Sequence, residues 1–303
     1  MTPLDIRGPL RASVLSALVL TATCVPTRAH AQEDQSGHAG MDMASHDHGS
    51  SEPETPGWHW STDARAFVGG NWQDRKFRDF RTFESQNWLM AAGRRQGTLD
   101  AVTVAAMFSL EPWTIQRIGS PQVFQTGETY RGAPLIDYQH PHDLFMGLGA
   151  EYRRATPTGS WYVGADLVGA PTLGPEPFMH RASADIFPTA PLSHHSLDST
   201  HITPGVLRTG LRVGTWGVEG SWFHGREPDE RRTDLDLGRL DSYAARLSWT
   251  RGPWQAQASG ARRHLPEATT PYDADTLTAS LAYRSEEHTS ELQSHHDLVC
   301  RLL

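Results

Sequence analysis

Residues 58–283 alternate between apolar and polar positions with a period of two. In one such segment Tyr243, Leu247 and Trp249 share a face, while Arg246 lies on the opposite face. This period predicts β-strands with one apolar face, because successive side chains of a strand point to opposite sides. Ten strands are predicted, namely 64–72, 85–93, 100–110, 145–153, 161–167, 207–213, 216–222, 242–250, 254–261 and 275–283.

The connections between the predicted strands alternate between short and long. The short ones cover 94–99, 154–159, 214–215 and 251–253, and the long ones cover 73–84, 111–144, 169–205, 224–241 and 262–274. Outer-membrane barrels have short periplasmic turns, long outer loops and strands of about nine to eleven residues. The pattern therefore predicts an all-β fold, an up-and-down antiparallel transmembrane β-barrel of about ten strands.

Aromatic residues gather beside the predicted short turns. Those on the apolar faces are Tyr152, Trp161, Trp216, Trp249, Trp254 and Tyr283. Three further tryptophans, Trp72, Trp88 and Trp222, lie nearer the long connections. In a barrel, the first group would form an outward girdle at the periplasmic interface of the membrane. A soluble β-sandwich would instead bury these aromatics in its core, but their gathering at one end of the strands favours the barrel.

Charge and composition exclude two other classes of protein. The chain has 27 Lys and Arg against 35 Asp and Glu, a formal net charge of −8. A nucleic-acid-binding protein needs a basic face, so we expect no nucleic-acid partner. Only 38% of the residues are apolar, which is too few for a bundle of membrane-spanning helices.

Both ends of the chain depart from the alternating pattern. Residues 1–31 have a basic start, a short apolar stretch and a small-residue cleavage motif, as a secretory signal peptide does. Residues 32–57 contain no apolar run and predict a disordered tail rich in His and Met. Residues 284–303 resemble a translated sequencing adapter: two segments match consecutive parts of the adapter in the same reading frame. We therefore expect the barrel to cover residues 58–283.

Taken together, these features resemble a known class of membrane protein. A signal peptide, alternating strands, connections of alternating length and an aromatic girdle look like a Gram-negative outer-membrane β-barrel. The resemblance covers roughly residues 58–283. It implies a location in the bacterial outer membrane, reached by a cleaved signal peptide, with outer-membrane lipid as a partner.

The predicted tail carries soft and borderline metal ligands close together. They are His38, Met41, Met43, His46 and His48. Thioether sulfur suits Cu(I), and imidazole suits Cu(II) or Zn(II). The tail resembles the Met- and His-rich N-terminal segments of bacterial copper-resistance proteins, including their outer-membrane component. That resemblance implies copper handling, whereas the alternative is a solvated linker that happens to contain histidine.

A second group of candidate ligands lies in the two longest predicted loops. The loop at 111–144 carries His140, His142 and Asp143, and the loop at 169–205 carries His180, His194, His195 and His201. Adjacent long loops of a barrel meet over its mouth. The predicted ligands of copper or zinc there are His140, His142, His180, His194 and His195. The alternative is that these histidines pack the loops through hydrogen bonds to Asp and backbone groups.

Two functions without a metal are weighed against this one. The predicted inner face carries Glu151, Asp166, Arg208, Arg212, Glu219 and Arg246, which would either line a narrow pore or brace a filled barrel. Ten strands enclose little free space, which favours bracing. Ser193, Ser196 and Ser199 lie near histidines and Asp198, but no nucleophile-elbow glycine pattern accompanies them. An outer-membrane lipid hydrolase is therefore the most distant alternative, and no catalytic residue is predicted.

The adapter resemblance makes a prediction about the gene. Resequencing the genomic locus should show a different sequence after the codon of Tyr283, because adapter DNA is joined to a fragment during library preparation. Genomic DNA that encodes residues 284–303 as printed would contradict this interpretation.

Overall fold

The computed structural model describes residues 57–75, 79–125, 128–181 and 183–284. Within them, ten strands form one antiparallel sheet in which each strand pairs with its neighbours along the chain. The all-β class and the up-and-down order predicted from the sequence are confirmed. The strands are β1 (Trp58–Gln73), β2 (Phe80–Gln96), β3 (Asp100–Phe108), β8 (Phe145–Thr156), β9 (Gly159–Gly169), β10 (Thr203–Val213), β11 (Trp216–Phe223), β12 (Ser242–Arg251), β13 (Trp254–Arg263) and β14 (Ala274–Tyr283).

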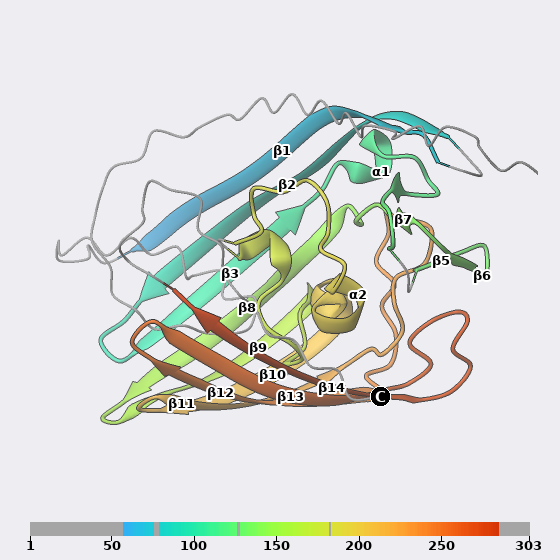
Figure 1. Ribbon diagram of the computed structural model, residues 1–303. Coiled ribbons are helices and arrows are strands. Elements are labelled where there is room, and N and C mark those ends of the chain that lie inside the picture. The colour runs from blue at the N-terminus through green and yellow to red at the C-terminus, as the bar shows by residue number, and fades with distance from the viewer. Residues whose placement is uncertain (1–56, 76–78, 126–127, 182, 285–303) are drawn as a thin grey trace, which may run out of the picture.

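The sheet curves into a deep trough rather than a flat layer (Figure 1). Strands β1 and β14 stand at the two ends of the strand order, and in the described part of the chain they do not pair with each other. The ten strands thus have the order expected for a barrel, but the sheet is not closed.

Short glycine turns join the strands at one end of the trough. Gly214 between β10 and β11 has φ of 55°, and Gly252 between β12 and β13 has φ of 54°. Two-residue hairpin turns need a positive φ, which glycine adopts without steric cost. The turns predicted at 214–215 and 251–253 are therefore confirmed, and the long connections lie at the opposite end (Figure 1).

The long connections contain only short elements. Strands β4 and β7 form one small antiparallel pair, and β5 and β6 form another. The short elements are α1 (Glu111–Thr114), β4 (Ser120–Pro121), β5 (Glu128–Tyr130), β6 (Ala133–Leu135), β7 (Tyr138–Gln139), η1 (Phe178–His180), α2 (His194–Leu197) and η2 (Ser199–His201).

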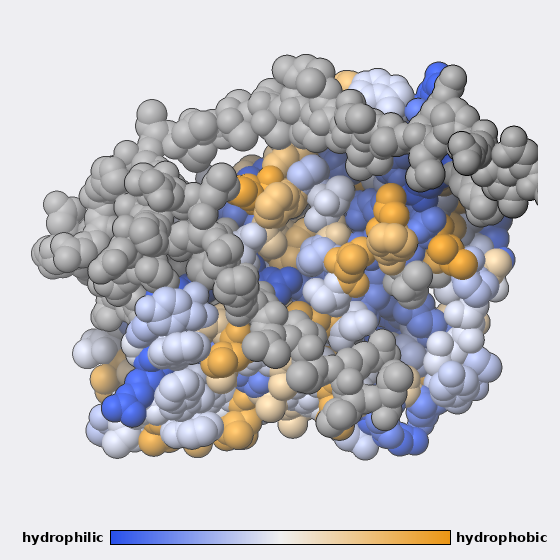
Figure 2. All heavy atoms as spheres, viewed as in Figure 1, coloured by the Kyte–Doolittle hydropathy of each residue, from blue (hydrophilic) through white to orange (hydrophobic). Residues whose placement is uncertain are grey.

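The convex face of the sheet carries exposed apolar side chains, and the concave face carries buried charged ones. A sheet in a water-soluble protein usually has its apolar face buried and its charged face exposed. On the convex face the apolar side chains are exposed, including Leu211 at 51%, Val218 at 58% and Leu247 at 46%. On the concave face Asp166 and Arg246 are buried at 7% and 2% exposure. In Figure 2, hydrophobic side chains reach the lower rim of the sheet, and the hollow contains both hydrophilic and hydrophobic ones.

Ion pairs satisfy the charges on the concave face. Arg208 donates from Nη1 to Glu151 Oε2 over 2.6 Å and from Nε to Asp166 Oδ2 over 2.8 Å. Arg246 donates from Nε to Glu219 Oε2 over 2.7 Å. This pairing is what the bracing interpretation predicts, because each of these buried guanidinium groups meets at least one carboxylate.

The connection between β9 and β10 folds into the trough and is held there by polar contacts (Figure 1). Gly174 donates its backbone N–H to Ser259 Oγ over 2.8 Å and accepts Arg246 Nη1 at its carbonyl over 3.1 Å. Leu173 packs in a small apolar cluster with Val206 and Phe223. Backbone hydrogen bonds and local apolar packing therefore fix this loop against strands distant in sequence.

A separate apolar core fills the trough above β2, β3 and β8. Its buried members are Trp88, Met90, Met107, Met146, Phe178 and Met179. Trp88, which the sequence predicts only to lie nearer the long connections, points into the trough. Phe178 and Met179 of η1 cover the inner face of β2, so Trp88 is buried at 8% exposure.

The remaining aromatics follow the predicted girdle. Rings on neighbouring strands pair as Tyr152–Trp161, Trp216–Trp249 and Trp254–Tyr283, with centroids 5.6, 6.5 and 4.8 Å apart. All three pairs lie beside the short turns, and Trp216, Trp254 and Tyr283 are exposed.

Several predicted segments lie outside the described residues. They are the signal peptide at 1–31, the tail ligands His38, Met41, Met43, His46 and His48, and residues 285–303 of the adapter-like segment. The adapter resemblance predicts no defined contact for residues 284–303, and for Arg284 this is wrong: its backbone N–H donates to Pro253 O over 2.8 Å, and its Nη2 lies 3.8 Å from Glu176 Oε2. The backbone hydrogen bond extends the pairing of β14 with β13 by one residue and does not depend on the side chain.

The buried ion pairs generate a stability prediction. Arg208→Leu should lower the free energy of unfolding by about 3–5 kcal/mol, because Glu151 and Asp166 would stay buried without their cation. Arg231→Leu is the control, since its pair with Asp234 is exposed and should contribute less than about 1 kcal/mol. Urea unfolding of the purified variants measures both, and equal losses would contradict the bracing role.

Candidate functional site: a histidine cluster between the long loops

Five histidines from two long connections meet on the concave side of the sheet. His140 and His142 precede β8, His194 and His195 lie in α2, and His201 ends η2. Their ring centroids are 6.4 Å apart for His140 and His195, 5.6 Å for His142 and His201, and 5.3 Å for His194 and His201. The predicted meeting of the two loops is therefore observed.

The cluster borders a small cavity of about 30 Å³. All five histidines line it, together with Asp143, Arg226, Arg232 and Arg263. A space of this size holds about one water molecule or one ion.

Three of the rings are oriented by hydrogen bonds at Nδ1. This atom lies 3.0 Å from Glu111 Oε2 in His142, 2.7 Å from Asp198 Oδ1 in His194 and 2.9 Å from the Asp198 carbonyl oxygen in His201. An ionised carboxylate and a backbone carbonyl can only accept hydrogen bonds, so Nδ1 carries the hydrogen in each ring. The Nε2 atom of each neutral ring is then left with a lone pair.

Both anchoring acids are themselves held in place. Glu111, at the start of α1, accepts the backbone N–H groups of Asn87 and His142 at its two oxygens, over 3.2 and 2.8 Å. Asp198, between α2 and η2, accepts Arg181 Nη2 over 2.9 Å. The anchors come from connections on either side of β8 and β9, so folding of the sheet is required to assemble them.

The Nε2 atoms of two rings are buried without a hydrogen-bond partner among the described residues. They belong to His142 and His201. Buried polar atoms in folded proteins nearly always have a partner, so such an atom calls for an explanation. Structural packing alone accounts for the Nδ1 bonds of these rings but not for their Nε2 atoms.

Burial and neighbouring charge shift the pKa values of these rings in different directions. Burial lowers the pKa of His194 and lowers that of His201 well below its ordinary value. Burial would also lower the pKa of His142, but the Glu111 carboxylate outweighs it and the pKa is raised. Burial raises the pKa of Asp143, although the nearby Arg232 guanidinium opposes this.

The candidate ligands predicted from the sequence have different places in the structure. His140, His142, His194 and His195 all line the cavity. His195 Nε2 lies 3.1 Å from Gln139 Oε1. His180 lies beside the cluster rather than on the cavity, with its ring 5.2 Å from that of Trp88.

Sequence reasoning left His201 out of the predicted ligands, although it lies in the same loop. The only signal was its place seven residues after His194, which does not indicate a shared site in irregular structure. The sequence does not mark Glu111 and Asp198 as anchors either, because they lie 87 positions apart and hydrogen-bond to neighbouring histidine rings only in the fold.

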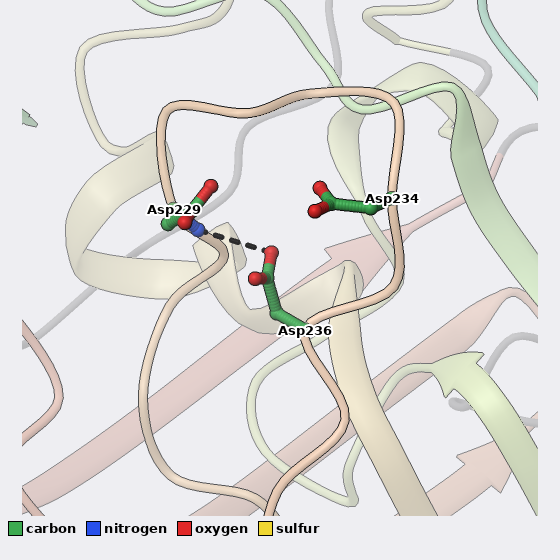
Figure 3. A group of neighbouring side chains, drawn as sticks. All are labelled: Asp229, Asp234 and Asp236. Carbon is green, nitrogen blue, oxygen red and sulfur yellow. Dashed lines mark hydrogen bonds between the residues drawn. The ribbon is translucent and has the colours of Figure 1, made fainter.

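A group of acids in the β11–β12 connection was not predicted. In the described chain, ligand atoms of three residues come within 4.8 Å of one another only at Asp229, Asp234 and Asp236 (Figure 3). Asp236 Oδ2 accepts the Asp229 backbone N–H over 3.1 Å, and Arg231 Nη1 lies 3.4 Å from Asp234. Partial burial and the two neighbouring carboxylates raise the pKa of Asp236. Asp229 and Asp234 are exposed, and an exposed acidic group by itself does not define a site.

The geometry gives little support to a serine hydrolase. His194 and Asp198 have the His–Asp contact of a catalytic triad, but Ser199 Oγ donates to the backbone carbonyl of His195. The Ser199 hydroxyl hydrogen is thus directed to a carbonyl oxygen, not to an imidazole that could accept it as a base.

Comparison with known proteins found no family model and no curated protein that matches this chain.

The shifted pKa values generate a prediction about stability and pH. Below about pH 6.5, His194 and His201 bind protons more readily in the unfolded chain than in the fold, because their pKa values are lowered in the fold. These two residues should therefore destabilise the fold as the pH falls. His142 acts in the opposite sense, because its raised pKa contributes stability at low pH that is lost as the pH rises.

Two variants separate these effects in urea unfolding between about pH 7.5 and pH 5. His201→Gln should reduce the loss of stability at low pH, and His142→Gln should increase it. A change in the same direction for both variants would contradict the assignment.

Proposed function

We propose that the chain is an outer-membrane β-barrel protein whose long loops handle a transition-metal ion, copper or zinc. The observation that carries the membrane location is the inverted polarity of the sheet. Exposed Leu, Val and Trp side chains cover the convex face, and paired charges occupy the concave face.

Water is an unfavourable solvent for this convex face. Moving one Leu or Val side chain out of water contributes about 1.5–3 kcal/mol, and the strands expose many of them. A bilayer provides the apolar environment that such a surface requires, and its interface favours the paired aromatics beside the short turns. In the described part of the chain, no helix has the length and apolar character needed to cross a membrane.

The histidine cluster supports the metal-handling part of the proposal. Five imidazoles around one small cavity provide borderline nitrogen ligands that suit Cu(II) or Zn(II). The tail, with His38, Met41, Met43, His46 and His48, adds thioether ligands that suit Cu(I) and lies outside the described residues. A location in the outer membrane would expose the long loops to metal ions outside the cell.

A narrow pore without a metal is the second candidate. The inward arginines Arg208 and Arg246 would favour it if they faced open water. Both are instead paired with carboxylates, and Arg246 is 2% exposed. This pairing supports a filled interior rather than an open pore.

One substitution tests the membrane location directly. Leu247→Arg in the middle of β12 should lower the free energy of unfolding by about 2–4 kcal/mol, the cost of placing Arg near the bilayer midplane. Leu237→Arg is the matched control, because Leu237 is similarly exposed, at 52% against 46%, but lies in a connection. Folding into lipid vesicles measures both variants.

In a soluble protein, both exposed leucines would accept arginine with almost no loss. Equal and small effects, together with fractionation of the wild-type chain with soluble periplasmic protein, would therefore contradict the membrane location.

A further inference from the structure

We propose that His142, His194 and His201 form a three-histidine metal centre that binds one divalent ion of the Zn²⁺ or Cu²⁺ class. This inference rests on the proposed function and specifies the ligands and the class of ion. It separates these three rings from His140, His180 and His195, which lie near them.

The spacing of the rings fits one shared ion. The centroid of His201 lies 5.6 Å from that of His142 and 5.3 Å from that of His194. Imidazoles bound to one tetrahedral ion through nitrogens at about 2.0–2.1 Å have ring centroids about 5 Å apart. The His201 ring therefore neighbours both of the other two rings.

Hydrogen bonding at Nδ1 prepares each ring to bind through Nε2. Metal-binding histidines usually donate the other ring N–H to a carboxylate or a backbone carbonyl, which fixes the tautomer and the ring orientation. Glu111 and Asp198 supply these acceptors for all three rings. Their carboxylates also place negative charge next to the position of a cation.

The unpartnered Nε2 atoms point to a cation rather than an anion. The cavity is also lined by Arg226, Arg232 and Arg263, which would suit an anion. However, a neutral ring with its hydrogen on Nδ1 offers only a lone pair at Nε2 and cannot donate to an anion. Arg232 is in addition paired with Asp143 over 3.2 Å. A metal ion satisfies the orphaned nitrogens of His142 and His201, whereas an anion satisfies neither while the rings are neutral.

The donor set selects the class of ion. Three neutral imidazoles suit Zn²⁺ and Cu²⁺, whereas Ca²⁺ and Mg²⁺ prefer oxygen ligands. Cu(I) prefers thioether or thiolate sulfur, and the described methionines lie in the apolar core rather than on this cavity. The cavity of about 30 Å³ has room for one such ion.

Binding must draw the three rings closer together. In the described chain, no three histidine nitrogens lie within 4.8 Å of one another, whereas ligands of one ion lie closer than this. The rings belong to two connections, so an ion that joins them also ties these connections together. Metal binding should therefore protect both loops from proteolysis.

The experiment titrates Zn²⁺, Cu²⁺ and Co²⁺ into the purified full chain and follows binding by calorimetry. The visible absorption of Co²⁺ is a second readout, because it is much stronger in tetrahedral than in octahedral coordination. We expect one equivalent of Zn²⁺ and a tetrahedral Co²⁺ spectrum. Both should be lost in His201→Ala and in His142→Ala.

His264→Ala is the matched control. His264 Nδ1 lies 2.7 Å from Asp273 Oδ1, the same distance as in the His194–Asp198 pair, but His264 does not line the cavity. This variant should bind like the wild type. If a His→Ala variant fails to fold, Glu111→Gln replaces it, because loss of an anchoring carboxylate should weaken binding about 10- to 100-fold without removing a ligand.

Deletion of residues 32–57 distinguishes failure of the three-histidine centre from failure of the metal-handling function. Zn²⁺ binding that survives the deletion and is lost in His201→Ala supports the three-histidine centre. In the chain without residues 32–57, binding that survives in both His142→Ala and His201→Ala, or that gives an octahedral Co²⁺ spectrum, overturns the centre while leaving metal handling by the chain in place. Absence of stoichiometric binding of any of the three ions to the full chain would overturn both the centre and the metal-handling function.

Discussion

Charged groups inside the trough must be paired, and the rest of the structure depends on this constraint. Arg208 and Arg246 are buried and would strongly destabilise the fold without their carboxylates. Two apolar clusters cover parts of the concave face, but the rest of it is built from ion pairs, serines and threonines, which supply little hydrophobic stabilisation. Hydrophobic stabilisation of the ten-stranded sheet must come largely from the convex face, and it is available only if an apolar medium covers that face.

The same polar interior organises the long connections. Arg246 donates one hydrogen bond to the carbonyl of Gly174 and another to Glu219. One side chain therefore joins the wall of the trough to the loop inside it. The loop in turn positions Asp198, which anchors two histidine rings. A disturbance of the ion pairs should therefore reach the histidine cluster, although the two are formed by different residues.

The strand pattern could be predicted from the sequence because it is local. Each of the ten predicted strands is present, and the turn at Gly214 lies where the glycine and the change of pattern place it. The direction of Trp88 could not be predicted, because it depends on Phe178 and Met179 from a loop about 90 residues later. Closure of the sheet also depends on pairing between distant strands and was not observed between β1 and β14.

The histidine cluster could be predicted only in part, because its details also depend on contacts between segments distant in sequence. The sequence predicts that histidines meet in the long loops at one end of the strands, and four of the five predicted loop ligands line one cavity. Which rings share an ion depends on the tautomer, and the tautomer depends on Glu111 and Asp198. No local pattern marks these acids as partners of the histidines, so only the folded arrangement distinguishes His201 from its neighbours.

Spin labelling along β12 tests most directly whether a bilayer covers the convex face. Residues 32–283 contain no cysteine, so single cysteines at successive positions from 242 to 251 can each carry one nitroxide label in lipid vesicles. The account predicts a period of two, in which labels at positions 243, 245 and 247 are accessible to oxygen dissolved in lipid and those at 244 and 246 are not. Labels at 243, 245 and 247 that are instead accessible to a water-soluble nickel complex would contradict it.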